Sequence, residues 1–98
     1  MAVIDRIGPG RVVISRSGHD RGRYLMVLGV EPPYVYLADG VHRKGIPKKK
    51  KILHVRLTNA YSSRIGLLVQ EGTVPDDELI REELEKALPQ LHRENKEC

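Results

Sequence analysis

Residues 10–30 read G-R-V-V-I-S-R-S-G-H-D-R-G-R-Y-L-M-V-L-G-V, and this stretch decides the fold. Apolar runs rich in β-branched residues flank a short polar segment, and such runs are typical of strands. We expect strands over Arg11–Ser15 and residues 24–30, joined by a turn over residues 16–23. The turn contains Gly18 and Gly22, which adopt positive φ angles without the steric cost that other residues incur. It also carries three arginines and a histidine, so it holds positive charge in front of a small sheet.

The second of these strands is apolar on both faces. Because side chains alternate along a strand, one face is expected to carry Tyr24, Met26, Leu28 and Val30, and the other Leu25 and Val27. An apolar outer face needs cover, which indicates that another element packs on the sheet from outside.

Three further strands are expected. Pro32 and Pro33 end the second strand because proline lacks a backbone donor, and Tyr34–Ala38 follows as the third strand. Asp39-Gly40 is a strong hairpin signal, so a return strand is expected to start over residues 41–43. Residues 44–51 are expected to form a basic loop. Residues 52–57 are expected as the fifth strand, with Leu53, Val55 and Leu57 inward and His54 and Arg56 outward.

The pattern changes to helical spacing after residue 59. One helix is indicated by Tyr61, Ile65, Leu68 and Val69, although Gly66 in its middle costs about 1 kcal/mol relative to alanine; Gly72 would stop it. A second helix is indicated by three acids followed by an apolar stripe of Ile80, Leu84, Leu88 and Leu91, with Ala87 beside it. Pro89 is expected to end or kink this helix, and residues 92–98 are expected to fray.

These elements predict a mainly β fold. We expect a small five-stranded antiparallel barrel followed by one or two C-terminal α-helices. The chain is accordingly divided into a barrel over residues 1–58 and a helical extension over residues 59–98, packed on the barrel or flanking it.

The chain of 98 residues has a formal net charge of +4, which is unevenly distributed. Residues 1–56 carry 12 Lys or Arg against four Asp or Glu, whereas residues 57–98 carry five against nine. The positive field is therefore concentrated in the strand-rich part, where it would attract a polyanion such as the phosphates of a nucleic acid. The alternative is a basic surface that serves solubility alone.

Residues 10–30 resemble the KOW motif of ribosomal and transcription-elongation proteins. That motif consists of a strand, a turn with an S-G-x-D-x-G core and a second strand. The core residues here are Ser17, Gly18, Asp20 and Gly22. The segments L-A-D-G-V-H-R-K and P-K-K-K-K-I-L-H-V, at residues 37–44 and 47–55, resemble small bacterial KOW-domain RNA-binding proteins. These are related to a large-subunit ribosomal KOW protein of archaea and eukaryotes. The resemblance covers roughly residues 6–58.

The resemblance implies an SH3-like barrel that binds RNA, with ribosomal RNA or the ribosome as the expected partner, and it implies no enzyme activity. Two groups of basic residues are the candidate phosphate contacts: Arg16, His19, Arg21 and Arg23 in the turn, and Arg43, Lys44, Lys48, Lys49, Lys50 and Lys51 in the basic loop. The alternative for the loop is a solvated segment without a partner. Asp20 is expected to hydrogen-bond the turn backbone. Because KOW barrels in elongation factors also bind proteins, a protein-interaction module that uses the barrel groove or the C-terminal helix is the second hypothesis.

Other residues give weaker indications of a functional site. Tyr34 and Tyr36 share a face and either stack on bases or cover the barrel against the C-terminal helix. The four histidines lack metal-ligand spacing, and no nucleophile has a base at recognisable spacing, so we expect no metal, cofactor or catalytic residue. Glu82, Glu83 and Glu85 are expected on a solvated helix face.

Cys98 is the single cysteine and the first ten residues lack a signal-like apolar run. We therefore expect a cytoplasmic protein without membrane contact.

Overall fold

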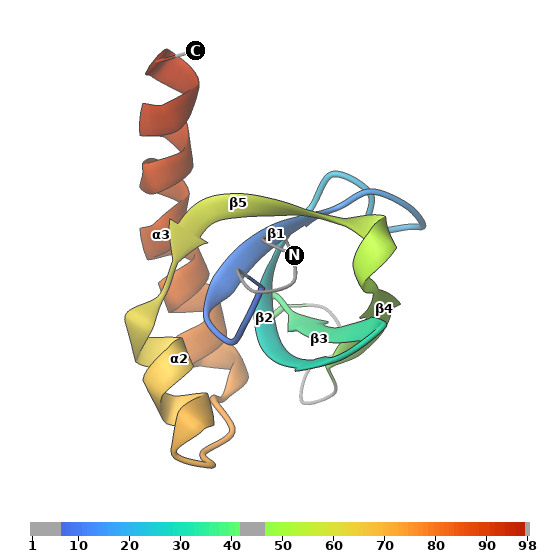
Figure 1. Cartoon of the computed structure of the whole chain (residues 1–98). Helices are drawn as coiled ribbons and strands as arrows, with labels where there is room; N and C mark the ends of the chain where they lie inside the picture. Colours follow the sequence, from blue (N-terminus) through green and yellow to red (C-terminus); the bar gives the residue numbers. More distant parts are fainter. Residues whose placement is uncertain (1–6, 42–46, 98) are drawn as a thin grey trace.

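A computed structural model describes residues 7–41 and 47–97 of the chain. Five strands, β1 (Arg11–Ser15), β2 (Tyr24–Glu31), β3 (Tyr34–Ala38), β4 (Lys48–Lys51) and β5 (Val55–Tyr61), form one antiparallel sheet in the order β4-β3-β2-β1-β5. The 3₁₀ turn η1 (Ile52–His54) joins β4 to β5. The helices α2 (Ser63–Gln70) and α3 (Asp77–Glu97) follow the sheet (Figure 1).

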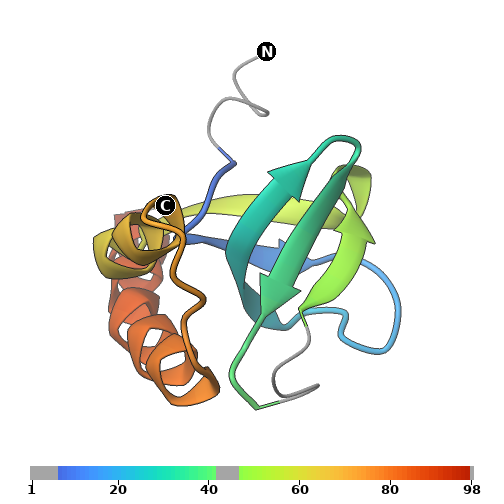
Figure 2. The same ribbon diagram turned by 90° about the horizontal axis from the view of Figure 1, so that it is seen from below.

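The expected mainly β architecture, five antiparallel strands followed by two helices, is confirmed. The strands β1 and β3 have the expected bounds, and β2 is one residue longer than expected. The sheet curls strongly but is not closed, because β4 and β5 are its two edges (Figure 2). Within the described residues, no helix is long and apolar enough to cross a membrane.

The sheet separates two apolar clusters. The inner cluster lies within the curl and contains Ile7, Val13, Leu25, Val27, Val35, Leu37 and Val55. The outer cluster lies between the sheet and the two helices and contains Val12, Met26, Ala60, Ile65, Ile80, Leu84 and Ala87. The cover expected over the outer face of β2 is therefore supplied by α2 and α3, which occupy one side of the sheet in both views (Figures 1 and 2).

A β-bulge alters the faces of β2. Val27 pairs with Leu37 and Gly29 with Tyr36, so one extra residue is inserted in β2 between these pairs. An inserted residue reverses the side-chain alternation beyond it. Val30 consequently packs against the inner cluster. The prediction that Val30 lies on the same face of the strand as Met26 is therefore wrong.

The chain between Gly40 and β5 also departs from expectation. Gly40 has a positive φ of 79°, as a hairpin glycine would, but Val41 is a bend rather than the start of a return strand. Residues 42–46 lie outside the described residues. Ile52–His54 is a 3₁₀ turn instead of strand, and the Val55 amide closes it by donating to the Ile52 carbonyl. Leu53, expected inward, is consequently 79% exposed.

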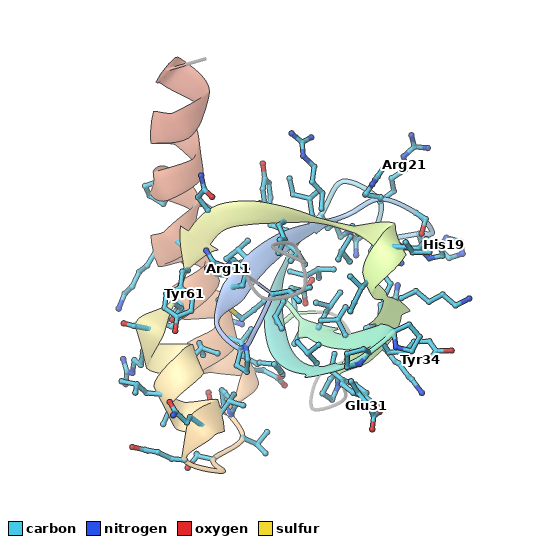
Figure 3. All side chains as sticks on the ribbon, in the orientation of Figure 1. Arg11, His19, Arg21, Glu31, Tyr34 and Tyr61 are labelled. Carbon is cyan, nitrogen blue, oxygen red and sulfur yellow. The ribbon has the colours of Figure 1, made fainter. Side chains whose placement is uncertain are left out.

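From Val55 to Leu57 the fifth strand alternates as expected. Val55 is buried and Leu57 half-buried, whereas Arg56 is exposed. The strand continues to Tyr61, so Tyr61 belongs to β5 rather than to a helix. Its ring lies 5.2 Å from the guanidinium carbon of Arg11 on the neighbouring strand (Figure 3).

A buried polar contact joins the two helices. The Ser62 hydroxyl accepts a hydrogen bond from the Ile65 amide at 3.2 Å and so caps α2, and it donates to Glu83 of α3 at 2.8 Å. Glu83 is only 8% exposed, so its expected position on a solvated face is wrong, whereas Glu82 and Glu85 are exposed as expected. The helix does not end at Pro89, and its backbone remains helical to Glu97. The carbonyl that Pro89 leaves without a donor belongs to the exposed Glu85, where water can satisfy it.

Candidate functional site

The turn between β1 and β2 is closed by backbone hydrogen bonds. The Ser15 amide donates to the Arg23 carbonyl at 3.0 Å, and the Gly22 amide donates to the Ser15 carbonyl at 2.8 Å. Gly18 and Gly22 have φ angles of 82° and 86°, which confirms the positive φ expected of them. Both glycines thus shape the turn and contribute no side chain to a ligand.

Asp20 ties this turn to strand β4. Its side chain is 7% exposed, and its carboxylate accepts a hydrogen bond from the Ser15 hydroxyl at 2.7 Å and lies 2.7 Å from Lys48 Nζ and 3.4 Å from Lys50 Nζ. Lys50 also donates to the Ser17 carbonyl at 3.1 Å. Asp20 therefore fixes the turn through contacts of its carboxylate with the side chains of Ser15 and of two lysines 28 and 30 positions later in the sequence, and not through the expected hydrogen bond to the turn backbone.

These contacts lower the pKa of Asp20 to about 2 from its ordinary value of 3.8. Burial raises the pKa, but hydrogen bonds from Lys48 and Ser15 and the positive charges of both lysines lower it by more. The unfolded chain therefore binds this proton more readily than the folded protein does.

We predict that this carboxylate contributes about 2 kcal/mol to stability, fully present above about pH 5 and lost as the pH falls toward about 2. The measurement is the urea midpoint of unfolding across that range for the wild type and Asp20→Asn. The variant should lack this part of the acid sensitivity, and parallel profiles for the two proteins would contradict the prediction.

The prediction of a basic loop is wrong for residues 48–51, because these residues form strand β4, which pairs with β3. Alternation along the strand divides the four lysines. Lys48 and Lys50 reach Asp20, with side chains 31% and 9% exposed, whereas Lys49 and Lys51 are exposed on the other face. Two of the four candidate contacts are therefore engaged with Asp20, and two are available at the surface.

The basic residues of the turn are all exposed. Arg16, His19, Arg21 and Arg23 project from a segment whose one acid is buried and ion-paired. Arg21 and His19 extend from the side of the molecule opposite α2 and α3 (Figure 3). The structure thus brings the turn and β4 together, while Arg43 and Lys44, the remaining candidates, lie outside the described residues.

Tyr34 and Tyr36 share the outer face of β3. Lys51 lies opposite Tyr34 and Lys49 opposite Tyr36 in the strand register, and Lys49 Nζ is 4.3 Å from the centre of the Tyr34 ring. The Tyr36 hydroxyl donates to Glu31 at 2.9 Å, a bond that raises the pKa of the phenol. Both rings are half-buried, and Tyr36 lines a groove together with Val69 of helix α2.

An apolar groove of about 310 Å³ lies between the sheet and the segment that joins the two helices. It is lined by Leu28, Gly29, Tyr36, Pro47, Val69, Gly72, Thr73, Val74 and Pro75. Val74 at its rim is 81% exposed. Its walls offer almost no charged or hydrogen-bonding group, so it suits an apolar side chain better than a polar ligand.

The described part of the chain contains no group of three or more His, Cys, Asp or Glu side chains that could hold a metal ion. Cys98 lies outside it. Comparison of the chain with protein-family models and with curated protein sequences finds no match.

Proposed function

We propose that this chain is an RNA-binding protein of the KOW type, with an SH3-like barrel architecture, that associates with ribosomal RNA through the turn and the exposed face of β4. The observation that carries the proposal is the set of four exposed basic residues on a turn fixed by Asp20. Arginine presents a fork of donors that suits phosphate oxygens. A fixed turn loses little conformational freedom when it binds, which favours affinity.

The charge distribution supports the same surface. Asp20 is neutralised by its lysines, so no exposed acid interrupts the cations of residues 16–23. The acids of residues 76–85 lie on α3 or just before it, on the opposite side of the sheet from the turn (Figure 1). Such a separation of charge orients a basic surface toward a polyanion and keeps the opposite side away from it. Phosphate contacts of this kind fix position and orientation more than sequence preference.

We predict that replacing Arg16, Arg21 and Arg23 together by alanine weakens binding to RNA and reduces its salt dependence. Each phosphate contact releases counterions, so the loss of three contacts should make the slope of log affinity against log salt shallower by about 2–3. The measurement is fluorescence anisotropy with a fluorescein-labelled stem–loop RNA between about 50 and about 200 mM KCl.

A variant with the same loss of charge is the control. Arg64, Arg81 and Lys86 lie on the exposed surface of α2 and α3, and Arg64 and Lys86 also contact the buried Glu83 at 3.9 and 3.4 Å. Their replacement by glutamine, which can still donate a hydrogen bond to Glu83, should leave the slope near that of the wild type. Equal slopes for the two triple variants would contradict the proposed surface. Alanine at Lys48 or Lys50 is unsuitable here, because both lysines hold Asp20. Crosslinking in cells, followed by sequencing of the bound RNA, tests whether ribosomal RNA is the partner.

The apolar groove favours a second candidate function, a protein-interaction module of the translation or transcription machinery. Its partner would insert an apolar side chain between β2 and the segment that joins the helices. Val74→Asp places a charge at the exposed rim. If protein interaction is the function, Val74→Asp should abolish capture of the protein partner and leave RNA affinity unchanged. If RNA binding is the function, the triple arginine variant should lose RNA affinity and leave capture of a protein partner unchanged.

A further inference from the structure

We propose that the outer face of the β3–β4 pair binds an unpaired RNA nucleotide, with its base stacked on Tyr34 and its phosphate held by Lys49 and Lys51. The inference rests on the proposed RNA-binding function and extends it from phosphate contact to a preference for single-stranded segments.

The strand register builds this face. Tyr34 pairs with Lys51 across β3 and β4, and opposed residues project to the same side of a sheet. Lys49 and Lys51 are exposed, and the Tyr34 ring is half-buried with one face close enough for the Lys49 ammonium to lie 4.3 Å from its centre. A flexible lysine thus occupies the place above the ring where a planar base would stack.

The competition between lysine and base favours the base. An exposed cation–π contact is weak, and stacking of a nucleobase on an aromatic ring is stronger. A base that displaces Lys49 from the ring leaves its ammonium free to contact the phosphate of the same nucleotide. Bases within a duplex are already stacked and do not present a free face to a side chain.

Glu31, the acid next to this face, determines on which side of Tyr34 the RNA backbone would lie. Glu31 lies opposite Tyr34 on the β2 side, where its carboxylate accepts the hydrogen bond of Tyr36. Because Glu31 would repel a phosphate, the RNA backbone is expected on the β4 side of the ring, next to the two lysines. Tyr36 lines the apolar groove and is bonded to the acid that would repel a phosphate, whereas the Tyr34 ring has the Lys49 ammonium over its face. The stacking role is therefore assigned to Tyr34.

This face adjoins the proposed phosphate-binding turn. Lys48 and Lys50 of the same strand contact Asp20 of the turn, and Tyr34 lies on the same side of the molecule as His19 and Arg21 (Figure 3). A strand of RNA that leaves the turn would therefore pass over Tyr34 without crossing the acidic surface of α3.

The test compares two variants on two RNA probes. Tyr34→Leu keeps an apolar side chain but removes the ring, and Tyr34→Phe keeps the ring. The probes are a stem with an unpaired loop and the same stem as a fully paired duplex, both fluorescein-labelled and measured by anisotropy. We expect Tyr34→Leu to bind the loop probe about 5- to 100-fold more weakly, with duplex binding unchanged and Tyr34→Phe close to the wild type.

The outcomes separate this inference from the proposed function. If the wild type binds neither probe, the proposed function is wrong and the stacking site with it. If the wild type binds RNA but Tyr34→Leu binds the loop probe equally well, the stacking site alone is wrong. A loop carrying 5-iodouridine gives an independent readout on the wild-type protein: photocrosslinking should label the peptide that contains Tyr34, and exclusive labelling of other peptides would overturn the inference.

Discussion

Replacement of Asp20 by alanine is expected to lower the free energy of unfolding by about 3 kcal/mol, because removal of one partner of a buried ion pair leaves an uncompensated charge. The Lys50 side chain is 9% exposed and would lose its counter-ion, and the Ser15 hydroxyl would lose one of its two acceptors, keeping the Ser17 carbonyl at 3.0 Å. Lys48, at 31% exposure, can turn toward water, which keeps the cost near the lower end of the range for such pairs. Urea unfolding at neutral pH, followed by circular dichroism, measures the change.

Two further variants test the cause of this loss. Glu82→Ala removes an exposed acid on α3 and should change stability by less than about 0.5 kcal/mol. The double variant Asp20→Ala with Lys50→Met should recover part of the stability lost in Asp20→Ala, because the buried cation is then absent as well. Equal stabilities for Asp20→Ala and Glu82→Ala would show that the ion pair does not hold the turn.

The local sequence determines much of this fold. Arg11–Ser15 and Tyr34–Ala38 are short β-branched or aromatic runs between turn residues, and they are strands with the expected bounds. The last helix begins where acids precede an apolar stripe, and Ile80, Leu84 and Ala87 of that stripe are buried. In both cases the signal lies within the element itself.

The tetralysine strand shows why other parts resist prediction. Four identical residues carry no alternation, so nothing within residues 48–51 distinguishes a strand from a loop. The strand forms because β3 offers its free edge, and the pairing of Leu37 with Lys48 then sets which lysines face the turn. The roles assigned to the four lysines change accordingly. Lys48 and Lys50 fix the turn through Asp20, whereas Lys49 and Lys51 remain at the surface. Lysine at an exposed sheet edge also discourages pairing with other chains.

The glycines give a second example. Asp39-Gly40 predicts a hairpin, and Gly66 reads as a weakness in a helix. In the structure, a Cβ at Gly66 would lie 2.6 Å from the Tyr61 hydroxyl and 3.0 Å from the Pro9 carbonyl oxygen. Gly40 lies against the first turn of α3. Both glycines permit close approach between segments distant in sequence, which no local pattern reveals.

Replacement of Gly40 by alanine is expected to destabilise the protein by about 2–4 kcal/mol, the combined cost of a left-handed backbone for alanine and of overpacking. The φ angle of Gly40 is 79°, and an added Cβ would collide with the Asp77 carbonyl oxygen and lie 2.8 Å from the Arg81 amide nitrogen. Both atoms are backbone atoms of α3 and cannot rotate away. Relief requires the start of α3 to shift, which disturbs the packing of Ile80 in the outer cluster.

Gly72 supplies the matched control for this second prediction. Its φ angle is 87°, but no atom lies within 4 Å of an added Cβ. Gly72→Ala therefore carries the backbone cost alone, about 1–2 kcal/mol, and the difference between the two variants in urea unfolding measures the close approach of Gly40 to α3. If Gly40→Ala and Gly72→Ala are equally destabilised, the contact between Gly40 and α3 contributes nothing, and the seating of the helix on the sheet must depend on the outer cluster alone.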